Sequence, residues 1–171
     1  MKKILVIITV LAISGFSKVQ SQQIKIAHIN TQELLASLPE SDSAQAKIQQ
    51  TASELQETLE EMQVEFNTKY QDYLQNSTTY TPIKRQAKEA ELQDMNVRIQ
   101  QFQENAEREI QEMRQKLLTP IIENTTKAIE EVGRESGYTY ILDTSEGSTV
   151  IFSADNAVDI MEKVKAKLLA Q

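Results

Sequence analysis

Apolar residues recur at helical spacing between Ser41 and about Glu131, a stretch that contains no glycine. In its first half they follow alternating steps of four and three, which is a heptad pattern. The positions are Ile48, Ala52, Leu55, Leu59, Met62, Phe66 and Tyr73. Lys69 fills the one polar position of this stripe. The pattern predicts an outgoing helix that buries a single narrow face.

The second half of the stretch carries a different apolar repeat. Its positions are Ile99, Phe102, Ala106, Ile110, Met113, Leu117 and Ile121, which follow an eleven-residue repeat. Such a repeat has a period of about 3.67 residues, slightly longer than a helical turn. Because the two halves differ in period, we expect a helical hairpin that packs imperfectly and can splay.

A helix-hostile run separates the two predicted helices. Asn76 to Pro82 is polar and β-branched, with Thr81 suited to cap a helix and Pro82 suited to its first position. At about 1.5 Å of rise per residue, the outgoing helix would reach roughly 50 Å. Pro120 lies inside continued helical periodicity, which predicts a kink where the hairpin meets the rest of the chain.

Shorter elements are expected on both sides of the hairpin. Residues 23–29 alternate as a strand of about six residues, and Asn30 or Thr31 caps a short helix that runs to Leu38. Residues 138–142 and 149–152 are rich in β-branched and aromatic side chains, which predicts a β-hairpin. Gly137 is a better cap than Gly133 for the long helix. A last helix follows residues 153–156, with expected buried residues Val158, Ile160, Met161, Val164, Leu168 and Leu169.

Together these elements predict an α+β fold with two parts. Residues 22–40 and 119–171 form a small, discontinuous, strand-containing body, and residues 41–118 form a long antiparallel helical hairpin, called the arm, with its tip near 76–82. About 60 residues make a marginal core for an isolated chain. We therefore expect the body to oligomerise through its strand edges.

The first 21 residues have the three parts of a cleavable export signal. Lys2 and Lys3 precede an apolar run from Ile4 to about Phe16, and Val19-Gln20-Ser21 offers a cleavage site. The apolar run is too short for a membrane span, which needs about 20 residues. Residues 1–21 are therefore predicted to be a signal peptide, and the mature chain is expected to start at Gln22.

Composition narrows the possible functions. The chain has no cysteine, which excludes disulfides, thiolate metal sites and a thiol nucleophile. Without Lys2, Lys3 and Lys18, 15 basic and 25 acidic side chains remain, a formal charge of −10. Nucleic acids and anionic lipids require clustered basic residues, so neither is expected as a generic partner.

The sequence offers no candidate for catalysis. His28 is the only histidine, and a lone histidine on a strand is usually structural. There is no Ser/His/Asp order, no phosphate-binding glycine loop and no histidine cluster for a metal. The arm carboxylates Glu57, Glu60, Glu61 and Glu65 suit a solvated helix face better than a cation site. We expect no enzyme activity, no cofactor and no metal.

Several segments, in this order around a long Gln/Glu/Lys-rich insert, resemble the Skp/OmpH family of periplasmic chaperones. They are Lys25–Asn30, Leu118–Ile122, Gly137–Asp143, Ala154-Asp155 and Asp159-Ile160. The resemblance covers essentially the whole mature chain and implies a jellyfish-like homotrimer in the periplasm. Three bodies would join through short strands, with Ile24, Ile26, Ile29, Ile141, Val150, Phe152 and Ile160 as trimerisation candidates.

The resemblance also implies a function. Members like Skp hold unfolded outer-membrane proteins between their arms without ATP until delivery to the outer-membrane assembly machinery. Candidate client contacts here are Tyr70, Leu74 and Tyr80, which lie off the stripe near the tip. Met62, Phe66, Met95 and Phe102 are further candidates, but packing within the stripe is the favoured interpretation of Met62, Phe66 and Phe102. Best-known members have basic tips, whereas residues 76–81 are uncharged, so we do not extend lipopolysaccharide binding to this chain. The alternative is a coiled-coil adaptor or structural protein of the cell envelope that binds one folded partner through the acidic arm.

Overall fold

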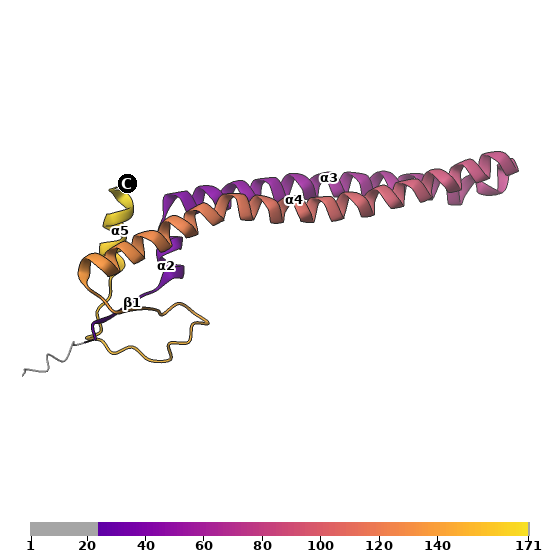
Figure 1. The fold of residues 1–171 in the computed structure, drawn as a ribbon. Helices are drawn as coiled ribbons and strands as arrows, with labels where there is room; N and C mark the ends of the chain where they lie inside the picture. The colour runs from indigo at the N-terminus through magenta and orange to yellow at the C-terminus, as the bar shows by residue number, and fades with distance from the viewer. Residues whose placement is uncertain (1–23, 171) are drawn as a thin grey trace, which may run out of the picture.

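The computed structural model describes residues 24–170, and the predicted signal peptide lies outside these residues. A long two-helix arm projects from a small body that contains both ends of the described chain (Figure 1). In chain order the elements are β1 (Ile26–Ile29), α2 (Thr31–Ala36), α3 (Pro39–Asn76), the 3-10 helix η1 (Ser77–Thr79), α4 (Pro82–Ser136), β2 (Tyr140–Asp143) and α5 (Met161–Leu169). The predicted α+β class is confirmed.

The first elements differ slightly in extent from the prediction. β1 has four residues rather than about six, and α2 ends at Ala36 rather than Leu38. Asn30 caps α2, since its side chain accepts a hydrogen bond from the Glu33 amide at 3.0 Å. Pro39 occupies the first turn of α3, where its missing N–H costs nothing, so this helix begins two residues before Ser41.

The predicted reversal lies where the sequence placed it. α3 ends at Asn76, η1 forms one tight turn, and Thr81 accepts a hydrogen bond from the Lys84 amide at 3.3 Å as the cap of α4. Pro82 is the first residue of α4. The two helices therefore run side by side and antiparallel along the arm (Figure 1).

α4 continues through Pro120 and enters the body. Pro120 lies inside this helix, and the orange end of α4 slopes away from the line of the arm in Figure 1. Gly137 ends the helix with φ 67°, and its N–H donates to the carbonyls of Gly133 and Arg134. The predicted left-handed cap at Gly137 is thus confirmed, because this φ favours glycine.

The sheet corrects the predicted β-hairpin. β2 pairs in parallel with β1, with Ile26 opposite Tyr140 and Ile29 opposite Asp143, and residues 149–152 form no strand in the described chain. The other edge of β1 bonds to the segment before α5: His28 N–H donates to Val158 at 2.9 Å, and Ile160 N–H donates to His28 at 3.1 Å. The predicted strand at residues 149–152 and the predicted hairpin are therefore wrong, because β-branched and aromatic composition gives a strand propensity but does not choose a pairing partner.

A small core holds the body together. Its buried members are Ala27, Ile29, Leu34, Ala128, Val132, Ile160, Met161 and Val164, contributed by β1, α2, the end of α4 and α5. Leu168 packs against this core as predicted. Val158 and Leu169 were also predicted to be buried, but this is wrong, since they are 42% and 84% exposed. The body therefore anchors the arm through the last turns of α4.

The helical arm as candidate functional site

The predicted apolar stripes of the two helices meet along the arm. Every predicted stripe position on α3 and α4 is buried or half-buried, and Lys69 is half-buried among them. Two residues in or beside this seam are almost fully covered: Ile48 at 2% exposure near the base and Met95 at 4% in the distal half. The heptad and eleven-residue patterns thus identified the packed face of each helix.

A polar cluster fills the one charged position of the seam. Lys69 on α3 pairs with Glu91 on α4, Lys88 donates to Glu91 at 2.7 Å, and Glu65 lies 3.4 Å from Lys69. Hydrogen bonds from Lys69 and then Lys88 lower the pKa of Glu91 to about 2. The carboxylate of Glu91 is therefore charged at neutral pH and joins the two helices.

Further polar contacts lie between this cluster and the tip. The Tyr73 hydroxyl donates to Glu89 across the hairpin at 2.5 Å, and this bond, with burial, raises the pKa of Tyr73. Arg85 donates to the Ser77 carbonyl at 3.1 Å. Lys84 lies 4.2 Å from the centre of the Tyr80 ring, a cation–π distance. The uncharged tip of the sequence is therefore flanked by basic side chains of α4.

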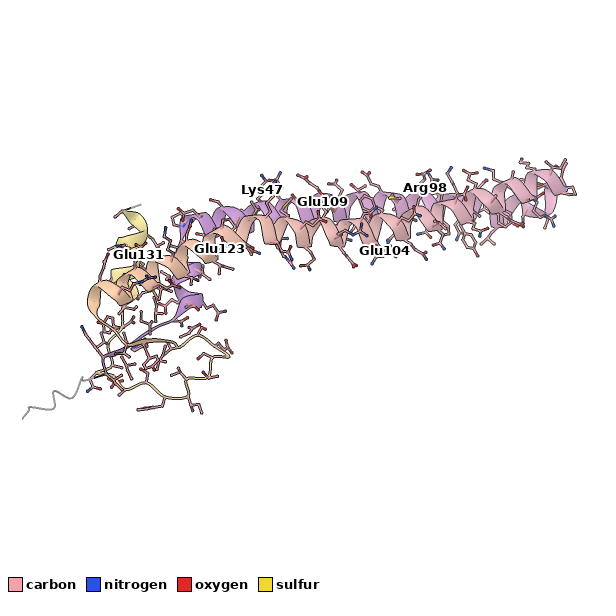
Figure 2. All side chains as sticks on the ribbon, viewed as in Figure 1. Lys47, Arg98, Glu104, Glu109, Glu123 and Glu131 are labelled. Atoms are coloured by element: carbon pink, nitrogen blue, oxygen red, sulfur yellow. The ribbon has the colours of Figure 1, made fainter. Side chains whose placement is uncertain are left out.

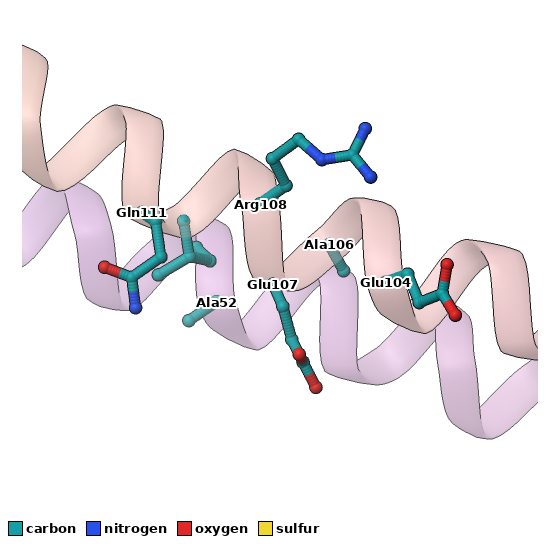
Figure 3. A pocket seen from close by; sticks show the side chains of 7 residues that line it. Ala52, Glu104, Ala106, Glu107, Arg108 and Gln111 are labelled. Carbon is teal, nitrogen blue, oxygen red and sulfur yellow. The ribbon is translucent and has the colours of Figure 1, made fainter.

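The middle of the arm is packed less well. Ala52 and Ala106 are both small, and a hollow of about 680 Å³ opens where their side chains lie between the helices (Figure 3). Glu104, Arg108, Ile110 and Gln111 are among the other lining residues. Among the described residues, no polar contact joins α3 to α4 between Ile48 and Phe66.

The predicted client contacts are placed on several surfaces. Tyr70 and Leu74 are 41% and 50% exposed, and Tyr70 stacks on Phe66 with the ring centres 6.0 Å apart. Met62, Phe66, Tyr80 and Phe102 are half-buried. Met95 is buried, so it cannot offer a contact surface while the arm is closed. Met95 lies outside the predicted apolar repeat, so the spacing did not identify it as a packed residue.

Two exposed apolar residues of the arm were missed. Val64 is 65% exposed on α3, and Ile83 is 83% exposed at the start of α4. Both lie off the stripes, which is the signal that could have identified them. Elsewhere charged side chains project from both helices along the arm, including the labelled Lys47, Arg98, Glu104 and Glu109 (Figure 2).

The predicted trimerisation residues divide into two groups. Ile24, Ile26 and Phe152 are 65%, 48% and 82% exposed, and Ile141 and Val150 are half-buried. Ile29 and Ile160 lie inside the core of their own chain at 1% and 0% exposure. Ile29 and Ile160 therefore stabilise the body from within, Ile141 packs against the same core, and Ile24, Ile26 and Phe152 are the exposed candidates.

The surroundings of His28 bear on its predicted structural role. The Nδ1 atom of His28 is buried and makes no hydrogen bond, but no acidic residue lines the cavity beside it. Within residues 24–170 no three His, Asp or Glu side chains gather as a metal site. No helix in this range is long and apolar enough to cross a membrane.

The similarity of this chain to known proteins extends over most of its length. A family model with the description "Outer membrane protein (OmpH-like)" matches residues 25–168. The chain belongs to the OmpH-like family. This family consists of periplasmic chaperones of outer-membrane proteins, which are non-enzymatic in general.

The fold is similar to that of a solved structure. The OmpH-like protein of Caulobacter crescentus CB15 superposes with a TM-score of 0.72 at 17% identity, over 85% of this chain and 83% of the other. At that identity the likeness shows the fold alone. No curated protein matches the chain. This member of the OmpH-like family therefore consists of a long helical arm on a small body.

Proposed function

We propose that this chain is an ATP-independent periplasmic holdase that encloses unfolded outer-membrane proteins and keeps them soluble. Membership of the OmpH-like family carries this proposal. The arm supports it, because exposed apolar residues near its distal half are separated by polar ones, as in Val64, Tyr70 and Leu74. Such spaced contacts would each be weak, so a client held at many of them could still leave.

The working form would be a homotrimer joined through the bodies. The exposed face of the body supports self-association, because Ile26, Tyr140, Leu142, Ile151 and Phe152 are 41–100% exposed and lie on or beside the two-stranded sheet. Monomeric proteins rarely leave such a patch open to water. The outer edge of β2 also has no strand partner within the described chain. Three arms carried by one such assembly would surround a shared space.

The proposal assigns parts of the chain to separate tasks. Residues 22–40 and 119–171 would form the trimerisation body, residues 41–118 the client-holding arm, and residues 1–21 the export signal. Delivery of the client would require the outer-membrane assembly machinery as a further partner. Nucleic acid is not among the proposed partners, because the mature chain is acidic.

Light scattering tests the holdase activity directly. An outer-membrane β-barrel protein diluted from urea should aggregate less when an equimolar trimer of the mature chain is present. Replacing Tyr70 and Leu74 by serine should weaken this protection, while replacing the neighbouring Gln71 and Gln75 by serine serves as a matched control. Unchanged aggregation with the unmodified chain would contradict the holdase and favour an adaptor that binds one folded partner.

A further inference from the structure

The arm differs in how its two helices are joined along its length. Near the base, Ala44 and Ile48 of α3 are buried. In the distal half, Met95 is buried and the cluster of Lys69, Lys88 and Glu91 lies next to it in the seam. Both ends of the hairpin therefore have strong contacts between helices.

The distal contacts bind α3 to α4 at successive turns. Lys69 pairs with Glu91, and one turn further out Tyr73 donates to Glu89 at 2.5 Å. The Lys69 and Glu91 side chains are 37% and 32% exposed, and Glu65 and Lys88 join them in one network, which holds better than an isolated exposed ion pair. Arg85 then fastens the start of α4 to η1. We call residues 65–95 with these contacts the distal clasp.

The section between the base and the distal clasp lacks such contacts. The hydrogen bonds of its side chains stay within α3, from Gln50 to Glu54 and from Gln56 to Glu60. Its seam contains Ala52 and Ala106, whose short side chains leave the hollow seen in Figure 3. Small side chains in a seam make fewer dispersion contacts than large ones, so the helices attract each other less at Ala52 and Ala106 than at seam positions with larger side chains.

We propose that the arm opens first in its middle, where residues 52–62 of α3 face residues 98–110 of α4, while the distal clasp stays closed. A hairpin held only at its base would instead loosen progressively toward its tip. Here the half-buried side chains Leu55, Leu59, Ile99 and Phe102 become accessible without separation of the tip. The opened section would present an apolar surface that the closed arm covers.

Hydrogen exchange of the mature chain, followed by mass spectrometry of its peptides, tests this order. Peptides from 52–62 and 98–110 should exchange about tenfold faster than peptides from 67–75 and 86–95, since exchange reports local opening. A steady rise in exchange from base to tip would overturn the proposal. This readout needs no client, so it stands or falls separately from the holdase activity.

Two variants test what causes the predicted exchange pattern along the arm. Glu91→Ala should speed exchange at 67–75 and 86–95 and leave the middle unchanged, with the exposed Glu112→Ala as the matched control. Ala106→Leu should fill the hollow and slow exchange in the middle only. If Glu91→Ala changed exchange no more than Glu112→Ala, the clasp would not hold the distal arm. If Ala106→Leu changed the distal peptides as much as the middle, the hollow would not set the opening site.

Discussion

The carboxylate of Asp143 accepts two hydrogen bonds from Thr31. The Thr31 hydroxyl donates to Oδ2 at 2.7 Å, and the Thr31 amide donates to Oδ1 at 3.2 Å. Asp143 is the last residue of β2 and Thr31 is the first residue of α2. This contact therefore joins the part of the body that precedes the arm in sequence to the part that follows it. The Ser145 amide also donates to Oδ1, at 2.9 Å.

Replacing Asp143 by alanine should destabilise the body. Three donors would lose their acceptor, including an amide of the first turn of α2, so we expect a loss of about 1–2 kcal/mol in the free energy of unfolding. Chemical denaturation measures this loss. Asp155→Ala is the control, because that exposed residue has no hydrogen bond among the described contacts. Equal stability of both variants would show that the contact contributes nothing.

Asp143 also adds a pH dependence with a defined sign. Burial acts to raise the pKa of Asp143, but the hydrogen bonds from Thr31 and Ser145 outweigh it and hold the pKa below its ordinary value. The stability that it contributes is therefore present above the unfolded pKa and is lost as the pH falls through the folded value. The difference in stability between the unmodified chain and Asp143→Ala should shrink accordingly below about pH 4.

Glu91 predicts a second acid transition, located in the arm. Its pKa is lowered from an ordinary 4.5 to about 2 by Lys69 and Lys88, so its contribution is complete above pH 4.5 and is lost between pH 4.5 and 2. The melting temperature of Glu91→Gln should lie below that of the unmodified chain at pH 6 and approach it at pH 2. Glu112→Gln should follow the unmodified chain throughout. A gap that stays constant from pH 6 to 2 would contradict the pairing.

The end of α4 packs tightly against β2 at Gly133. A Cβ atom built on Gly133 would lie 2.9 Å from Cδ1 of Ile141, which is the movable end of a side chain. Gly133→Ala gains about 1 kcal/mol of helix propensity, and displacement of Ile141 offsets this gain. Ile141→Val removes the displaced methyl, so the double variant should be more stable than the two single effects predict. A double-mutant cycle by denaturation measures this coupling, and strict additivity would refute the contact.

The arm was predictable because its information is local. The spacing of the stripes, the Thr81 cap and the Gly137 cap depend on residues within a few turns, and each was identified from the sequence. The seam position of Lys69 also followed from spacing. Its partner did not, since Glu91 lies 22 residues away across the reversal and its identity depends on how the helices align.

The sheet was less predictable because its pairing is not local. Residues 140–143 pair with β1, more than a hundred residues earlier, although the nearby residues 149–152 have the same strand-forming composition. A parallel pair needs a long crossover, which the arm and the rest of α4 provide. Nothing in either segment alone distinguishes this arrangement from a hairpin. The partner of Lys69 in the distal clasp and the partner of β1 in the sheet both depend on the tertiary fold. Local sequence therefore predicts neither of them.

Two isoleucines of the body separate folding from assembly. Ile160 is fully buried at 0% exposure in the core of its own chain, while Ile151 is 100% exposed in the segment that lacks a strand partner. Ile160→Ala should cost about 2–5 kcal/mol of stability through the cavity it leaves.

Ile151→Ser should leave the fold unchanged but weaken the proposed homotrimer, because it removes apolar area that a second copy would cover. Circular dichroism and sedimentation velocity distinguish the two effects. Thr149→Ser is the control for the segment, and a trimer that resists Ile151→Ser combined with Phe152→Ser would exclude this face from the assembly.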